Sequence, residues 1–352
     1  MPLKQELFGK TSTGEDVYKF TFTNENKVTI SVLNFGCVIY EIKLPDRDGN
    51  VVDVNLGFDN VKDYEKNNNY FGALCGRVAN RIGNGEMTID GQTFKLSRND
   101  PLGGHIVHGG FVGFSRRVWD YKIEGDTLTL TYVDADGSEG FPGEVTTHVT
   151  FTLGEDNTLT MDYSATTTKT TVVDMGSHFM VNLAGHDKGA IKDHKVTVYS
   201  DKFLDIGDDF LPTGKLISVD EDPVMDFRSG RDLAGEVLET LSGGCAFHHA
   251  FVFDRRGERK RMARVDHPGS GRYLEVASTN STVFAYSNHF MPQIVGDAPC
   301  KAGARYPRYA AIEFMPMGYP NSVKMPEFPQ SVLRPDQQYR ETAWYTFGLQ
   351  EQ

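Results

Sequence analysis

Apolar and polar residues alternate in short runs along most of the chain. This period of two is typical of β-strands, whose successive side chains point to opposite faces of a sheet. In one such run, Val145, Val149 and Phe151 fall on the same side. The runs that we expect to form strands are residues 28–33, 40–44, 51–56, 86–89, 92–96, 121–123, 127–133, 145–153, 158–166, 195–199, 251–253, 273–278, 281–286, 309–315 and 344–347.

Tight turns separate many of these runs. The Asp-Gly pairs at 48–49 and 90–91 and the GEDN segment at 154–157 are typical of β-hairpin turns. Helical periodicity is scarce, and only residues 233–239 and a turn at 60–65 fit it. So many strands at hairpin spacing, with few short helices, predict an all-β protein built as one large antiparallel β sandwich.

The composition is that of a globular chain of 352 residues, with 39% hydrophobic and 24% charged residues. Glycines and prolines are spread along the chain, and no internal repeat or low-complexity segment is present. We therefore expect a single domain over residues 1–352, although a division near 160–200 stays open. The net charge of −12 argues against nucleic acid or an anionic membrane as a partner.

The N-terminal segment MPLKQELFGKTSTGED lacks the apolar stretch of a signal peptide, and no run is long enough to cross a membrane. The four cysteines form no CxxC pair. Cys37, Cys75 and Cys245 lie among small or apolar neighbours, as reduced thiols of a protein core do. These features favour a cytoplasmic protein.

Glu313 is the first candidate for chemistry, because it is the one carboxylate of the apolar run YAAIEFM at 309–315. Both faces of this run look buried, which would raise the pKa of Glu313. Such a carboxylate either pairs with a buried cation or moves protons near neutral pH. His178 also lies in an apolar segment, and the alternatives there are an acid–base group and a core histidine with satisfied hydrogen bonds.

Two arginines, Arg77 and Arg81, interrupt the Gly- and Ala-rich segment FGALCGRVANRIGNG. Their guanidinium groups would either bind a polar ligand or pair with a buried carboxylate, Glu313 included. The sequence alone leaves these two alternatives open.

A metal or cofactor site has little support. His105 and His108 are three residues apart, but the glycines on both sides indicate a loop and not the helix of a zinc protease. The chain also lacks GxSxG, a GxGxxG after a strand and GxxxxGK[ST]. We therefore expect neither metal nor cofactor. Four further histidines lie in polar turns or on a polar strand face, and we expect them at the surface: His148, His186, His194 and His267.

Four segments occur in this order along the chain: GRVANRIGNGEMTIDG at 76–91, HIVHGGFVGF at 105–114, EGFPGE at 139–144 and SHFMVNLAGHDKGAIKDH at 177–194. They are similar to GRxANRI, LHGG…GF, a GYPG turn and NHSYFNLAG, in that order, and so the chain resembles the aldose 1-epimerase (galactose mutarotase) family. Later stretches, LPTGKLISVDEDPVMDFR and LRPDQQYRETAWYTF, also fit, so the resemblance spans nearly the whole chain. It implies a galactose mutarotase-like antiparallel β supersandwich and an isomerase that interconverts the α and β anomers of a free monosaccharide.

The resemblance also implies roles for residues. Glu313 would be the general base that takes the proton of the C1 hydroxyl, and His178 the general acid that protonates the ring oxygen. The ring would open, the C1–C2 bond rotate and the ring close again from the other side. Asn80, Arg81 and His108 would hold the sugar and polarise its oxygens. A small sugar is the implied partner of a monomer or dimer, with no cofactor.

Two substrate-binding positions depart from the family pattern. His248 stands where the family has an aspartate that bonds sugar hydroxyls, and Phe284 stands where it has a glutamine. The loop at 316–320, directly after Glu313, is also longer than usual. Three alternatives follow: an epimerase of a free monosaccharide, the same chemistry on a modified sugar or less polar cyclic hemiacetal, and a carbohydrate-binding protein without catalysis.

Overall fold

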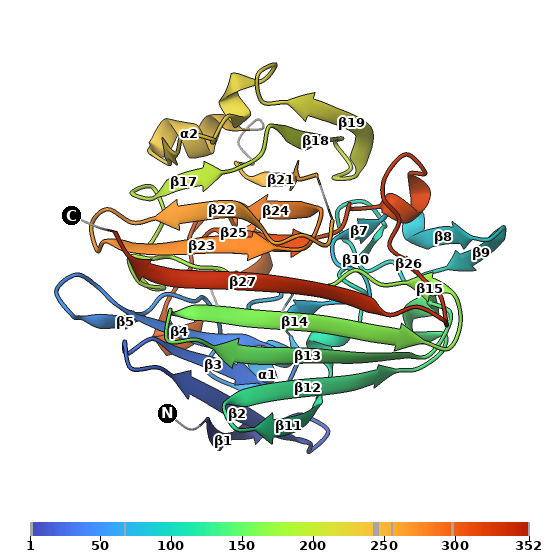
Figure 1. Ribbon diagram of the computed structural model, residues 1–352, viewed down its shortest axis with the longest axis horizontal. Helices are drawn as coiled ribbons and strands as arrows, with labels where there is room; N and C mark the ends of the chain where they lie inside the picture. The colour runs from blue at the N-terminus through green and yellow to red at the C-terminus, as the bar shows by residue number, and fades with distance from the viewer. Residues whose placement is uncertain (1–2, 67, 242–245, 255, 297–298, 351–352) are drawn as a thin grey trace.

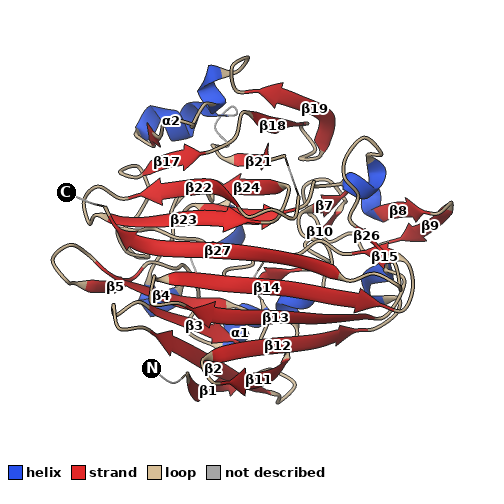
Figure 2. Cartoon of the chain, in the orientation of Figure 1, coloured by secondary structure: helices blue, strands red, loops and turns tan. Residues whose placement is uncertain are grey.

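The structure is a computed structural model that describes residues 3–66, 68–241, 246–254, 256–296 and 299–350. Strands dominate this part of the chain, as predicted (Figures 1 and 2). Its α-helices are α1 (Val61–Glu65), α2 (Gly235–Thr240) and α3 (Met291–Val295), of which the first two coincide with the predicted helical segments to within a few residues. None of these helices is long and apolar enough to cross a membrane. Cys37 and Cys75 are buried free thiols, as predicted, whereas Cys245 lies outside the described residues.

The largest sheet runs through the middle of the molecule and has nine antiparallel strands (Figure 1). Two five-stranded sheets and four two-stranded ladders complete the strand pairing of the described residues. In spatial order, the nine strands are β11 (Asp120–Glu124), β12 (Thr127–Asp134), β13 (Val145–Leu153), β14 (Thr158–Thr167), β27 (Tyr339–Leu349), β23 (Arg272–Ser278), β22 (Lys260–Asp266), β17 (Lys195–Val198) and β20 (Arg231–Asp232).

The remaining sheets have the following strands, each given in spatial order. The first five-stranded sheet comprises β1 (Lys4–Lys10), β2 (Asp16–Thr23), β3 (Thr29–Leu33), β4 (Ile39–Pro45) and β5 (Val51–Asp53). The second comprises β19 (Pro212–Ser218), β18 (Lys202–Ile206), β21 (His248–Val252), β24 (Thr282–Tyr286) and β25 (Glu313–Met317). The ladders pair β10 (Ile106–Val107) with β7 (Arg81–Ile82), β15 (Thr171–Val172) with β26 (Val332–Leu333), β16 (Gly176–Ser177) with β6 (Leu74–Cys75), and β8 (Glu86–Ile89) with β9 (Gln92–Lys95).

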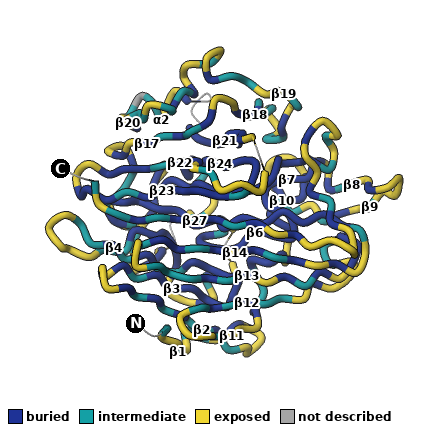
Figure 3. Tube along the Cα trace, viewed as in Figure 1, coloured by how far each residue is buried: buried dark blue, intermediate teal, exposed yellow. Residues whose placement is uncertain are grey.

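The core lies between the sheets, where the alternating side chains of their inner faces meet (Figure 3). In β13, Val149 and Phe151 point inward, and they share one buried cluster with Ile30 of β3 and with Val283 of β24. In strands such as β13, the period-two pattern of the sequence therefore gives one buried face, as it does in an antiparallel sandwich.

The strand that carries Glu313 starts later than predicted. We expected residues 309–315, but β25 begins at Glu313, because Tyr309 has a left-handed backbone conformation with φ of 61°. The strand then continues through Pro316, which has no N–H to donate. Because β25 is the last strand of its sheet, a proline is tolerated there. All five residues of β25 are buried, which confirms that both faces are covered.

Two of the histidines expected at the surface are buried. His194 and His267 lie in the interior, and the carboxylate of Asp193 bonds both of them, at 2.8 Å from Nδ1 of His194 and 3.0 Å from Nε2 of His267. The prediction was wrong because a polar neighbour in the sequence, the exposed Asp193, bonds the two buried imidazoles and so allows them to leave the solvent.

Arg77 is structural. Its side chain is fully buried, and Nε and Nη2 donate to the carboxylate of Asp134 at 3.0 and 2.7 Å. Nη1 donates to the carbonyls of Pro142 and Gly143 at 2.9 and 3.0 Å. Of the two alternatives for this arginine, the buried ion pair is correct, and its partner is Asp134 and not Glu313.

We predict that Arg77→Met lowers the free energy of unfolding by about 3–5 kcal/mol, because it leaves the Asp134 carboxylate buried without its partner. Urea unfolding followed by fluorescence measures this loss. The double variant Arg77→Met/Asp134→Leu removes both charges and should regain most of the stability. If the double variant is as unstable as the sum of the two single variants, the pair is not the reason for the loss.

Candidate active site

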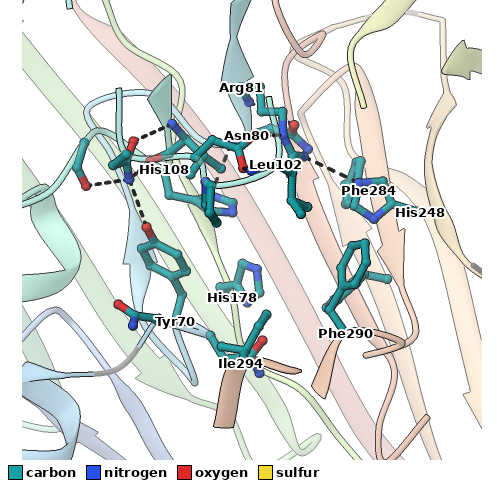
Figure 4. A pocket seen from close by; sticks show the side chains of 18 of the residues that line it. Tyr70, Asn80, Arg81, Leu102, His108, His178, His248, Phe284, Phe290 and Ile294 are labelled. Carbon is teal, nitrogen blue, oxygen red and sulfur yellow. Dashed lines mark hydrogen bonds and ion pairs between the residues drawn. The ribbon is translucent and has the colours of Figure 1, made fainter. Parts of the chain in front are cut away.

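A cavity of about 520 Å³ opens beside the second five-stranded sheet (Figure 4). Its walls come from β21, β24, β25 and α3 on one side, and from the loops that flank β7 and β10 on the other. Five of the residues that the sequence singled out line it: Asn80, Arg81, His108, His178 and His248. Phe284 lines it as well, so the structure brings together six side chains from four distant parts of the sequence.

Strand register explains why these side chains share one face. His248 of β21 pairs with Tyr286 of β24, and Tyr286 pairs with Glu313 of β25. Two residues along, Phe284 pairs with Met315. Because side chains alternate between the faces of a sheet, all five point to the side on which the cavity lies.

Glu313 and His178 are in contact, with Oε2 of the carboxyl 3.4 Å from Nδ1 of the imidazole. The exposed fraction of His178 is 7% and that of Glu313 is 1%. His178 lines the cavity, whereas Glu313 does not and lies behind it. Nδ1 of His178 is buried. The backbone of His178 is held by the hydrogen bond from its N–H to the carbonyl of Ala73 at 2.8 Å.

Burial sets the protonation of this pair. It raises the pKa of Glu313 well above the ordinary value of a carboxyl and lowers the pKa of His178 to about 4. Within the described part of the chain, no hydrogen-bond partner is found for either side-chain oxygen of Glu313 or for Nδ1 of His178. Neither Arg77 nor Arg81 reaches Glu313, so the alternative of a pair with one of these arginines is wrong. What remains is a desolvated acid–base pair at the cavity wall.

His108 is held as a hydrogen-bond donor. The backbone N–H of Asn80 donates to its Nδ1 at 3.2 Å, so the proton of the neutral imidazole is on Nε2. Burial, together with His178 and Arg81, holds the pKa of His108 well below its usual value and keeps it neutral. Both Asn80 and His108 have left-handed backbones, with φ of 60° and 51°, a conformation that costs free energy and is frequent at functional sites.

Arg81 pairs with a carboxylate that the sequence did not single out. Its Nε donates to Oδ2 of Asp100 at 2.6 Å, and both side chains are buried. Nη1 lies 3.5 Å from Nε2 of His248. Burial and Arg81 hold the pKa of His248 well below its usual value, so this imidazole is neutral and accepts from Arg81. The ring of Phe284 lies edge-on to His248, with 5.2 Å between centroids.

Tyr70 also lines the cavity and was missed. Its ring centroid is 4.7 Å from that of His108 and 5.9 Å from that of His178, so it packs against both imidazoles. Its hydroxyl accepts from the side-chain amide of Asn99 at 3.2 Å, and burial raises the pKa of the phenol to about 12. No pattern in the sequence pointed to Tyr70, because the turn that carries it has no motif of its own.

The residues described here contain no group of three or more His, Cys, Asp or Glu side chains that could hold a metal ion. The histidines of the cavity contact aromatic rings, amide groups and Arg81 instead.

The neutral histidines make the protein sensitive to acid. Because burial lowers their pKa values below about 6.5, their contribution to stability is present above that pH and is lost as the pH falls towards 4. Glu313 and Asp174, whose pKa values burial raises, act in the opposite direction. On unfolding near pH 5, five imidazoles each gain a proton and two carboxyls each lose one. The protein therefore takes up about three protons when it unfolds. The imidazoles are those of His108, His178, His248, His249 and His289.

We therefore predict that the free energy of unfolding falls by roughly 4 kcal/mol per pH unit near pH 5. Urea unfolding at pH 7.5, 6.0 and 5.0 measures the slope, with a small change expected between pH 7.5 and 6.5. Equal stability at pH 7.5 and 5.0 would contradict the assignment of neutral buried imidazoles.

Comparisons with known proteins agree with this geometry. The sequence model of the aldose 1-epimerase family matches residues 18–346. The chain is 34% identical to galactose mutarotase of Sus scrofa over 98% of each chain, and 29% identical to aldose 1-epimerase of Escherichia coli over 95% of this chain and 96% of that one. The crystal structure of an aldose epimerase homologue from C. elegans superimposes with a TM-score of 0.85 at 26% identity, covering 94% of this chain and 98% of the other. The chain belongs to the aldose 1-epimerase family, a family of carbohydrate isomerases with this β-rich fold.

Proposed function

We propose that this protein interconverts the α and β anomers of a free monosaccharide, with Glu313 as general base and His178 as general acid. The observation that carries the proposal is the desolvated contact between these two side chains, 3.4 Å apart at the wall of a cavity of suitable size. Buried polar groups normally have hydrogen-bond partners. A pair without them, of which one member lines a cavity, is expected where a substrate supplies the missing partners.

The pair carries out ring opening by two proton transfers, one to Glu313 and one from His178. In the reactive form Glu313 is a carboxylate and His178 an imidazolium. Glu313 takes the proton of the C1 hydroxyl while Nε2–H of His178 protonates the ring oxygen, and the C1–O bond of the ring breaks. The pair is then neutral, which is the form that burial favours. After rotation about C1–C2, the two proton transfers run in reverse and give the other anomer.

The position of Glu313 constrains the sugar. Because Glu313 lies behind the cavity wall, the C1 hydroxyl must approach along the edge of the His178 imidazole. Oε1, the oxygen that does not face this imidazole, is the atom that accepts the proton. Tyr70 packs against the other edge of His178 and fixes its orientation.

Two polar side chains are placed to hold the sugar. Nε2–H of His108 donates to a sugar oxygen, because Nδ1 is already bonded to Asn80. Arg81 donates through those guanidinium N–H groups that are not bonded to Asp100. These contacts orient the ring so that C1 meets the acid–base pair.

The unpartnered carboxyl of Glu313 favours catalysis over the alternative of a carbohydrate-binding protein without activity, because binding alone gives no reason to bury an acid–base pair. We also propose a cytoplasmic location, which the buried free thiols Cys37 and Cys75 support. The proposed chemistry needs neither metal nor cofactor, and a small sugar is the partner. It can be carried out by a monomer or a dimer.

We predict that Glu313→Gln and His178→Asn each lower kcat by about 10²- to 10⁴-fold, with a smaller effect on KM, because each removes one proton transfer and little contact area. Polarimetry of freshly dissolved α-glucose and α-galactose measures the acceleration over the spontaneous reaction.

Glu275→Gln is the matched control. This glutamate lies on β23, pairs with Arg261 and is remote from the cavity lining, so the variant should keep the parent rate. If Glu313→Gln keeps a third or more of kcat, the base is another residue. If the parent protein binds sugars but accelerates the anomerisation of none, the proposal of catalysis is wrong.

A further inference from the structure

The cavity has an apolar wall that runs from its buried base to an exposed rim. Phe284 and Met315, cross-strand neighbours on β24 and β25, are buried at the base. At the rim, the exposed fractions of Leu102, Phe111 and Ile294 are 51%, 55% and 38%. All three line the cavity, so these exposed apolar side chains are continuous with the candidate active site.

Exposed apolar groups that gather at one place mark a binding surface, whereas scattered ones do not. Leu102 and Phe111 lie on the loops that flank β10, and Ile294 lies on α3. Figure 4 shows Leu102, Ile294 and Phe290 around the same space as His178. We therefore expect a ligand of this cavity to contact the apolar side chains of the rim.

The polar groups of the cavity are distributed unevenly. Asn80, Arg81, Asp100 and His108 interact with one another in a single group, and His108 packs against His178 with 5.0 Å between ring centroids. On the side of the sheet, His248 is neutral and already accepts from Arg81. A sugar hydroxyl placed against Phe284 and Met315 at the buried base would lose its bonds to water without replacement, which disfavours a fully hydroxylated sugar there.

We propose that the preferred substrate is a reducing sugar with an uncharged apolar substituent at the end remote from C1, such as an O-alkyl or O-acyl group at carbons 4 to 6. The substituent lies against Leu102, Phe111 and Ile294 while C1 faces the acid–base pair. C1 itself carries a free hydroxyl, because ring opening requires it. This inference rests on the proposed function and names its substrate class.

The size of the cavity agrees with an extension of the sugar. A cavity of about 520 Å³ lies within the range that encloses drug-sized ligands, and so it leaves room beyond a free hexose. Arg116 also lines the cavity, where Nη2 donates to the side-chain oxygen of Asn68 at 2.7 Å and Nη1 donates to the carbonyl of Phe111 at 3.1 Å. These bonds hold the side chain of Arg116 at the rim.

The test compares four reducing sugars: glucose, 4-O-butylglucose, 6-O-butylglucose and the 6-O-(2-hydroxyethyl) ether of glucose. We expect kcat/KM of at least one butyl ether to exceed that of glucose roughly tenfold, because burial of a short alkyl chain favours its complex. The hydroxyethyl ether has similar length but a polar end and should gain little. Exchange between anomers, followed by NMR, gives all four values.

Leu102→Ser and Ile294→Ser should each reduce the preference for the butyl ether by roughly threefold to tenfold, measured as the ratio of the two kcat/KM values. Both side chains are exposed, so folding is not at risk. Leu216→Ser is the matched control, because Leu216 has an exposed fraction of 45% on β19, outside the cavity lining, and should leave the ratio unchanged.

Equal or lower kcat/KM for both butyl ethers, or a preference that neither cavity variant reduces, would overturn the inference while the proposed function stands. If none of the four sugars is anomerised, the proposed function fails instead. In that case, calorimetry measures how tightly glucose and the butyl ethers bind to the Glu313→Gln variant. This measurement tests the apolar site separately from catalysis. Tighter binding of a butyl ether supports it, and equal or weaker binding of both rejects it.

Discussion

The desolvation of Glu313 and His178 is the constraint on which the rest of this structure depends. Each buried polar atom without a partner costs about 1–3 kcal/mol, and the fold must offset this cost elsewhere. The offset comes from the large apolar core, which draws on side chains from Phe20 to Phe347. Neither side chain of the pair can relax towards water, because β25 is buried on both faces and Ala73 holds the backbone of His178.

The strand pairing of the second five-stranded sheet positions the side chains around Glu313. Cross-strand register places Glu313 beside Tyr286, and Tyr286 beside His248, so one face of three strands supplies Glu313 and one side of the cavity. The opposite side is made by short ladders and loops whose conformation is fixed locally. There Asn80 and His108 both have left-handed backbones, and two hydrogen bonds join them. The Asn80 N–H donates to Nδ1 of His108, and the His108 N–H donates to the carbonyl of Asn80. A rigid sheet thus faces a rigid loop pair across the cavity.

The sequence predicts those features that depend on local pattern. Strands such as β8 and β13 alternate cleanly and were predicted with the correct bounds, whereas β1 (KQELFGK), β18, β19 and β22 were missed, because charged or mixed residues on exposed edges and faces obscure their period. The resemblance to a known family brought together the six lining residues. It could not indicate the choice of ion-pair partners, since Asp134 and Asp100 are separated from Arg77 and Arg81 by 57 and 19 residues.

Asp100 changes how the substitution at 248 is understood. His248 is neutral and gives Arg81 no acidic partner on β21, and an unpaired buried guanidinium would be costly. Asp100 supplies the carboxylate from the loop that precedes β10. The negative charge next to Arg81 therefore lies on this loop, whereas the sheet side is neutral and aromatic around His248, Phe284 and Tyr286. Because Asp100 bonds Arg81, and Asn80 bonds both Arg81 and His108, the polar side chains of this part of the cavity form one connected group.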